Sequence, residues 1–198
     1  MDGMKKTLSH VLLFTSVLMI TGIGFGALLV LILNSDQRNQ LLDELNLLYG
    51  QGAAAADAGL SVMADEIRTL LLTWLLGLSC IGFPVILALV FAKGLAVGFT
   101  VGFFVHQWTW KGLLLAAVSV LPHNLLFVPA TILAASVGIR FSLILLSTLF
   151  GKGTTKLRNE WLRYNGVMAV VAAMFVLGGF VEAFVTVPLM NWVTSVWL

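Results

Sequence analysis

Long stretches almost free of charged residues alternate with shorter polar segments along this chain. The apolar stretches cover residues 8–33, 70–92, 112–150 and 166–189. Each is at least as long as the roughly 20 residues that an α-helix needs to cross a bilayer. Because backbone N–H and C=O groups in lipid must bond to one another, these stretches should be helices rather than open strands. The pattern predicts an all-α, polytopic integral membrane protein.

The composition excludes a soluble protein. Of the 198 residues, 60% are hydrophobic and 10% are charged, whereas a soluble domain has about 25% charged residues. The basic start followed by an apolar run is similar to a signal peptide, but the run continues to residue 33, well beyond the roughly 7–15-residue core of such peptides. We therefore interpret residues 8–33 as a retained first span and residues 1–198 as a single membrane domain. The only cysteine, Cys80, cannot form a disulfide within the chain.

The charges outside the apolar stretches predict which side of the membrane each loop faces. Cytoplasmic loops carry an excess of Lys and Arg. Residues 151–165 carry four bases and one acid, whereas residues 34–68 carry six acids and two bases. We therefore expect the N-terminus and residues 151–165 to face the cytoplasm, and residues 34–68 and the C-terminus to face outward. Lys93 would mark a second, very short cytoplasmic turn.

The stretch from 112 to 150 has to cross the membrane an odd number of times under this orientation. As one helix it would be about 58 Å long, nearly twice the hydrocarbon thickness of about 30 Å. Pro122 disfavours helix just before it and leaves a carbonyl without a donor. We therefore predict a re-entrant half-helix over 112–121, a turn at the Pro-His-Asn sequence, and a full span over about 125–150. The whole chain would have about five transmembrane helices plus this one broken, re-entrant helix.

Polar residues around this expected turn predict a cluster inside the membrane. His123 and Asn124 could bond the backbone groups that Pro122 and Pro129 leave free. Glu182 is the only acid inside an expected span, and a buried acid there needs a partner. His123 and Asn124 lie nearest in depth, whereas Arg140 would reach Glu182 only through long side chains or water. We favour a structural role for these polar residues over proton or ion handling.

Glycines at four-residue spacing predict close helix packing. Gly94, Gly98 and Gly102 share one helical face, and Gly22 and Gly26 repeat the spacing in the first span. Small residues let helices approach closely in lipid. We expect these two helices to pack against each other within one molecule, with a homodimer interface as the alternative.

Two polar segments also carry amphipathic patterns. In residues 34–68, interpreted as an outer helical hairpin, a stripe of apolar side chains is typical of either a connector or a partner-docking surface. In the basic segment 151–165, Trp161 lies among four bases that should contact anionic lipid headgroups. The docking residues are Leu41, Leu45, Leu48 and Tyr49, and the bases are Lys152, Lys156, Arg158 and Arg163.

Motifs of enzymes are not found in the sequence. It contains no His-Glu-x-x-His zinc motif, no Gly-x-Ser-x-Gly nucleophile motif and no phosphate-binding loop. We therefore expect no catalytic activity, no cofactor and no bound metal. We also expect lipids and proteins, rather than nucleic acid, as partners.

Three motifs carry a resemblance to a known family. They are FAKGLAVGF at 91–99, the Pro-His-Asn block with its second proline at 122–129, and GGFVEAFVTVP at 178–188. In this order and spacing, the chain resembles the stage II sporulation protein M family of small polytopic membrane proteins. Asn124 replaces a glycine of the family pattern and Phe127 replaces a glutamate, so that acid has no counterpart here.

The resemblance implies a function as well as a fold. It implies a non-enzymatic anchor in a bacterial cell membrane, at the septum during engulfment. This anchor would gather a lytic transglycosylase, stage II sporulation protein D, and an amidase, stage II sporulation protein P, which remodel cell-wall peptidoglycan. The alternative is a permease-like transporter subunit that works with a cytoplasmic ATPase. In that case the Pro-His-Asn turn, Arg140 and Glu182 would line the path.

Overall fold

The protein is a bundle of long helices. The computed structural model describes residues 2–50, 55–151, 157–182 and 184, and it describes their side chains except over 2–7, 44–50 and 55–62. Within these ranges the chain is helical apart from short turns, and it contains no strand. The elements are α1 (Asp2–Leu29), the short 3-10 helix η1 (Val30–Ile32), α2 (Ser35–Gly50), α3 (Ala55–Gly77), α4 (Gly82–Leu149) and α5 (Leu157–Val181).

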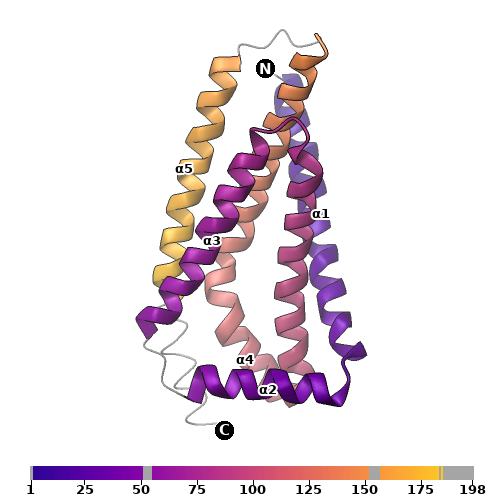
Figure 1. Ribbon diagram of the computed structural model, residues 1–198, viewed down its shortest axis with the longest axis vertical. Helices are drawn as coiled ribbons and strands as arrows, with labels where there is room; N and C mark the ends of the chain where they lie inside the picture. The colour runs from indigo at the N-terminus through magenta and orange to yellow at the C-terminus, as the bar shows by residue number, and fades with distance from the viewer. Residues whose placement is uncertain (1, 51–54, 152–156, 183, 185–198) are drawn as a thin grey trace.

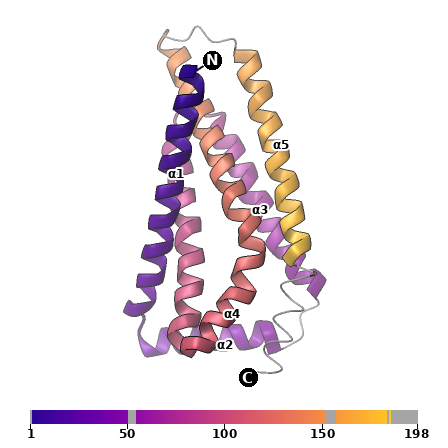
Figure 2. The same ribbon diagram turned by 180° about the vertical axis from the view of Figure 1, so that it is seen from behind.

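The 68 residues of α4 form two arms that run in opposite directions (Figures 1 and 2). The reversal is at Thr109, whose φ of 51° and ψ of −114° are not helical. Positive φ is uncommon for a residue other than glycine. We call residues 82–108 the first arm and residues 110–149 the second arm. A Cβ atom on Gly112 would lie 1.7 Å from the Phe104 carbonyl oxygen, so glycine is required where the second arm turns back against the first.

Most helices run along the length of the bundle, and α2 lies across one end. Figure 1 shows α2 at the end where the two arms of α4 meet, while the N-terminal end of α1 and the start of α5 lie at the other end. Three described helical segments are long and apolar enough to cross a membrane, namely Leu8–Ile32, Gly82–Leu149 and Leu157–Val181. Large apolar side chains such as Leu13, Ile20 and Phe25 are exposed along α1. These features are those of an all-helical membrane protein.

The second arm of α4 is the centre of the core. It contributes to each of three clusters of buried apolar residues. Phe127 and Phe141 pack against residues of α5, and Ala135 and Ile139 pack against residues of α1 and the first arm. Ala116 packs with Phe103 and Phe104 near the α2 end. The first two clusters therefore lie on different faces of the same part of this arm, the third lies nearer its start, and the other long helices pack around it.

The turn expected at Lys93 is at a different place. Lys93 lies inside the first arm, and the chain turns at residues 78–81, between α3 and α4. A Cβ on Gly82 would lie 1.8 Å from the Leu76 carbonyl oxygen, which shows how tightly the chain folds back. Pro84 follows within the first turn of α4, where its missing N–H has no helical acceptor. The prediction was wrong because residues 78–81 carry no charge and so do not interrupt the apolar run.

The predicted break at the Pro-His-Asn sequence was also wrong. Pro122 and Pro129 lie inside the second arm, which is helical throughout, and no re-entrant half-helix forms over 112–121. Figure 2 shows a change of direction part-way along this arm, and proline inside a helix is a common cause of such a bend. The chain instead reverses sharply at Thr109, and the second arm begins at residue 110, before the Pro-His-Asn sequence. Proline is tolerated inside membrane helices where neighbouring groups satisfy the freed backbone.

Two predicted polar segments belong largely to long helices. Residues 55–68, expected to be half of an outer hairpin, form the first part of α3, which runs along the bundle (Figure 1). Residues 157–165, expected to be an interfacial segment, are the first turns of α5. Polar residues in these two helical segments were interpreted as surface residues, although Glu66 and Glu160 are buried in the bundle.

Candidate functional site

The glycines at four-residue spacing lie at the contact between α1 and the first arm of α4. A Cβ added to Gly26 would lie 2.0 Å from the Leu95 carbonyl oxygen, and one added to Gly98 would lie 1.9 Å from the Ile23 carbonyl oxygen. Gly22, Gly94 and Gly102 also face backbone atoms of the opposite helix, at 2.6, 2.5 and 2.9 Å from an added Cβ. The two helices therefore meet backbone to backbone within one molecule. We call this contact the glycine interface.

A buried hydrogen bond joins α1 to the second arm of α4 as well. The hydroxyl groups of Thr15 and Ser136 are 2.8 Å apart, and both residues are fully buried. Each hydroxyl also lies within hydrogen-bond distance of a carbonyl of its own helix, Thr15 of Val11 at 2.9 Å and Ser136 of Ile132 at 2.6 Å, so one hydroxyl donates to its own helix while the other donates across the contact. Sequence analysis did not identify this pair, because isolated Thr and Ser residues in apolar helices usually bond only to their own backbone.

His123 and Glu182 approach each other near the α2 end of the bundle. His123 lies on the second arm and Glu182 directly follows α5, and their Nδ1 and Oε2 atoms are 2.5 Å apart. The side chains are 16% and 12% exposed. The angles are not those of an aligned hydrogen bond, and neither atom has another hydrogen-bond partner among the described residues. The contact is therefore a close approach between an acidic and a basic side chain from two different helical segments.

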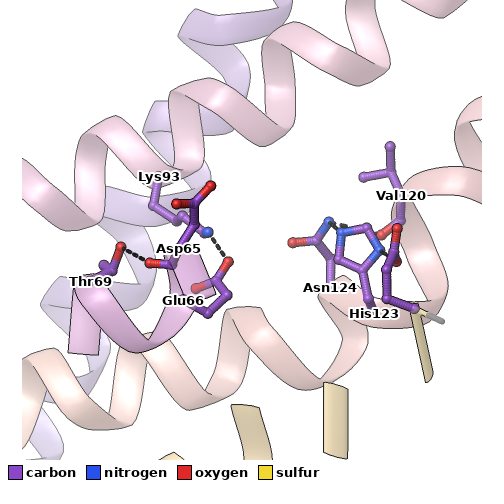
Figure 3. A network of polar contacts seen from close by, with 8 residues as sticks. Asp65, Glu66, Thr69, Lys93, Val120, His123 and Asn124 are labelled. Atoms are coloured by element: carbon purple, nitrogen blue, oxygen red, sulfur yellow. Dashed lines mark hydrogen bonds and ion pairs between the residues drawn. The ribbon is translucent and has the colours of Figure 1, made fainter. Parts of the chain in front are cut away.

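Asn124 completes this group without the role expected for it. Its amide lies 2.9 Å from His123 Nε2 and donates to the Val120 carbonyl at 2.9 Å (Figure 3). The carbonyls that lose their helical donors to Pro122 and Pro129 are those of Val118 and Leu125, four residues before each proline. Asn124 therefore orients the imidazole ring rather than capping a broken helix.

Arg140 does not belong to this cluster, contrary to the prediction. Its Nη2 donates to Glu160 Oε2 at 2.6 Å, and Arg163 lies 3.9 Å from the other oxygen of Glu160. Glu160 precedes Glu182 by about 33 Å along α5, at roughly 1.5 Å per residue. The intramembrane polar residues therefore form separate groups at opposite ends of the second arm.

A further ion pair joins α3 to the first arm. Lys93 Nζ contacts Glu66 Oε1, as Figure 3 shows, and the glutamate side chain is only 4% exposed. Sequence analysis placed both residues in loops. A usable signal was the spacing of Glu66, Leu70, Thr73 and Gly77, which places the acid on the buried face of one helix.

These groups act chemically as neutralised contacts between helices. A buried charge without a partner is strongly unfavourable, and each of these acids lies against a base from another helix. Aligned hydrogen bonds add to them between α3 and α5, where the Tyr164 hydroxyl donates to the Trp74 carbonyl at 2.7 Å and Trp74 Nε1 donates to Asn165 Oδ1 at 3.1 Å. Within the described ranges, no group of three or more His, Cys, Asp or Glu side chains is placed to hold a metal ion.

The predicted docking and headgroup residues are only partly described. Leu41 is partly buried and packs against the core near Phe103 and Phe104. Arg158 and Trp161 are exposed on the first turns of α5. The side chains of Leu45, Leu48 and Tyr49, and the whole of Lys152 and Lys156, lie outside the described part of the structure.

Comparison with protein families identifies the chain. The family model described as stage II sporulation protein M matches residues 15–187. The chain belongs to this family. The matched region contains the glycine interface and every ion pair described above, so these features lie within the stage II sporulation protein M domain. No curated protein and no solved structure matches the chain. Membership of the stage II sporulation protein M family, with three long apolar helical segments, indicates a sporulation-related membrane protein.

Proposed function

We propose that this protein is a non-enzymatic membrane scaffold that recruits peptidoglycan hydrolases to the septal membrane during engulfment. Its partners would be a lytic transglycosylase and an amidase, stage II sporulation proteins D and P. Family membership supports the biological setting. The observation that carries the proposal is α2, a polar helix that lies across one end of the bundle and leaves a pocket against it.

The proposed orientation places α2 outside the cell. The first residues of α1, the turn at 78–81 and the two sides of the basic segment 152–156 all lie at the end opposite α2 (Figure 1). Lys and Arg collect on the cytoplasmic side of membrane proteins, and that end is the basic one by sequence. With α4 counted as two arms, the chain crosses the membrane five times. α2 would then lie on the surface that faces the cell wall.

The pocket beneath α2 is suited to a partner's apolar side chain or anchor. It has a volume of about 440 Å³ and lies between Gln37, Gln40 and Leu41 of α2 and a floor that includes Leu29 and Phe99. Binding sites of this size with apolar walls and a few polar groups are typical of specific recognition. Leu41 of α2 packs against the core, which fixes this wall of the pocket to the bundle. A bound partner would therefore be held in a fixed position relative to the bundle.

The alternative, a transporter subunit, is not supported by the arrangement of the residues that it required. That hypothesis needed a broken helix at the Pro-His-Asn sequence and a path lined by Arg140 and Glu182. The second arm is continuous there, and Arg140 pairs with Glu160 near the opposite end of α5. Paired charges between helices favour a rigid body, and a rigid body suits a scaffold.

Co-purification of the two hydrolases from sporulating cells tests the proposal. Gln40→Trp should fill the pocket and reduce recovery of the hydrolases at least fivefold, while the variant stays in the membrane. Asn39→Trp is the matched control, because Asn39 is exposed on the same helix but does not line the pocket. Full recovery with Gln40→Trp, or equal loss with both variants, would contradict the proposed surface. Absence of both hydrolases from wild-type preparations would contradict the scaffold function itself.

A further inference from the structure

A second crevice lies at the opposite end of the bundle from α2. It has a volume of about 640 Å³ and opens between Leu8 of α1, the second arm of α4 and α5. Its walls are mostly apolar and include Leu133 and Val137 from α4 and Val167 and Val170 from α5. Val170 is 60% exposed, so the crevice is open toward the surroundings of the bundle. In a membrane, those surroundings are lipid.

One end of this crevice is charged. Arg140, Glu160 and Arg163 all line it, and two arginines against one glutamate leave one net positive charge. Glu160 is shared between the two guanidinium groups, at 2.6 Å from Arg140 and 3.9 Å from Arg163. Each guanidinium has five N–H donors in a planar arrangement that suits phosphate oxygens. A single phosphodiester would neutralise the excess charge.

The order of these residues along α5 matches the shape of a phospholipid. Glu160 and Arg163 come first, near the start of the helix, and Val167 and Val170 follow toward the middle of the span. From Glu160 to Val170 the helix rises by about 15 Å, which is about half of a 30 Å hydrocarbon core. The charged end therefore lies at headgroup depth and the apolar wall extends for the length of one acyl chain.

Gly166 lies between the charged end and the apolar wall. It lines the crevice, and an added Cβ would meet nothing within 4 Å. Glycine inside a helix is less favourable than alanine by roughly 1 kcal/mol, and contact with a neighbouring helix does not require it here. The missing side chain widens the crevice at the point where an acyl chain would enter it.

We propose that this crevice binds one anionic glycerophospholipid of the cytoplasmic leaflet. The phosphate lies against Arg163 and Arg140, and one acyl chain lies along the wall formed by the second arm of α4 and α5. The bound lipid fills the gap between α5 and α1 and adds a negative charge to the Arg140–Glu160–Arg163 group. The site is independent of the outer pocket at α2 and of any hydrolase partner.

Native mass spectrometry of the full-length protein in detergent tests the site. The protein is titrated with dioleoylphosphatidylglycerol, with dioleoylphosphatidylcholine and with inorganic phosphate. We expect one phosphatidylglycerol to bind about tenfold more tightly than phosphatidylcholine, because phosphatidylcholine carries the same phosphate together with a cationic choline, which the net positive charge of the site disfavours. Inorganic phosphate should not bind in the same range, because it lacks the chain. Equal binding of the two lipids would show a general lipid-facing surface, and binding of phosphate alone would show an ion site, and either result overturns the proposal.

Two charge variants locate the headgroup. Arg163→Gln should weaken phosphatidylglycerol binding about tenfold, and its side chain is 61% exposed, so the fold should persist. Arg158→Gln removes the same charge from the same helix but lines a different crevice of about 290 Å³ beside Trp161. Its affinity should stay within about twofold of wild type, as expected for a distant charge that is screened. Loss of binding in Arg158→Gln with none in Arg163→Gln would overturn the assignment.

Two size variants locate the acyl chain. Gly166→Leu should fill the crevice and remove lipid binding without affecting helix packing, since nothing lies within 4 Å of the added Cβ. Gly24→Leu is the matched control, because Gly24 is exposed on α1, has equally open surroundings and does not line the crevice. Retained binding in Gly166→Leu, or equal loss in both variants, would overturn the proposal.

Discussion

At the scale of single residues, the buried acids that the structure describes are matched by bases from other helices. Glu66 contacts Lys93, Glu160 contacts Arg140, and Glu182 contacts His123. Each pair joins two different helical segments, so it fixes their relative height as well as neutralising charge. Such pairs add little net stability when they form, but removing one partner leaves a buried charge that is strongly unfavourable.

The Glu66–Lys93 pair gives a test at this scale. Lys93→Met keeps the length of the side chain but leaves Glu66, 4% exposed, without its partner. We expect a loss of about 3 kcal/mol in the free energy of unfolding, measured by denaturation in mixed detergent micelles. Arg68→Met is the control, because Arg68 and Asp65 form an exposed pair, 78% and 74% exposed, whose removal should change stability by less than about 1 kcal/mol. Equal effects of the two substitutions would contradict a structural role for Lys93.

Sequence reasoning identified some of these residues and missed others for a physical reason. His123 and Glu182 were expected to meet because each interrupts an apolar stretch, where a polar group needs a partner. Glu66 and Glu160 were missed because they stand among other polar residues, where an acid usually faces water. Their burial depends on where a neighbouring helix packs, and a single sequence does not specify that.

At the scale of helices, α1 and the first arm of α4 behave as one unit. Their contact was expected from the glycine spacing, since close approach in lipid needs small residues. The turns between helices were harder to predict. Residues 78–81 carry no charge and have only Gly and Pro nearby as signals, whereas Pro122 and Pro129, the stronger signals, lie inside a continuous helix.

The glycine interface predicts a contrast between two glycines. Gly98→Ala should destabilise the protein by about 2 kcal/mol, because the new Cβ would lie 1.9 Å from the Ile23 carbonyl oxygen and force the helices apart. Gly24→Ala, on the exposed face of α1, should be neutral or stabilise by up to about 1 kcal/mol through helix propensity. Thermal unfolding in detergent measures both. If the two variants unfold at the same temperature, α1 does not depend on this contact.

At the scale of the whole molecule, the turns and helix ends fall into two sets at opposite ends of the bundle. The native cysteine reports on one of them, because Cys80 lies in the turn between α3 and α4 and is partly accessible. Long apolar helices were expected from hydropathy, and the residues of α2 were expected to form an amphipathic helix. The position of the turn at residues 78–81 could not be derived, because it lies within a long uncharged stretch where hydropathy does not change.

Cysteine labelling tests the orientation. In intact cells a membrane-impermeant maleimide should leave wild-type Cys80 unlabelled, and permeabilisation should expose it. In a Cys80→Ala background, Ser35→Cys at the start of α2 should be labelled in intact cells, because Ser35 is exposed at the opposite end. Labelling of Cys80 in intact cells, with protection of residue 35, would mean that the molecule is inserted the other way round.

The glycine interface also has a consequence for how the protein is made. Gly98 leaves the ribosome about 70 residues after Gly26, so at roughly 5–20 residues per second α1 is in the membrane for several seconds before its partner exists. During that time α1 must be held by its own hydropathy and length, with the glycine face against lipid. α2 and α3 are synthesised next, and they leave the ribosome before the first arm of α4 can pack against α1. Assembly therefore proceeds out of chain order, and the first helix inserted is packed only after the third lengthwise segment arrives.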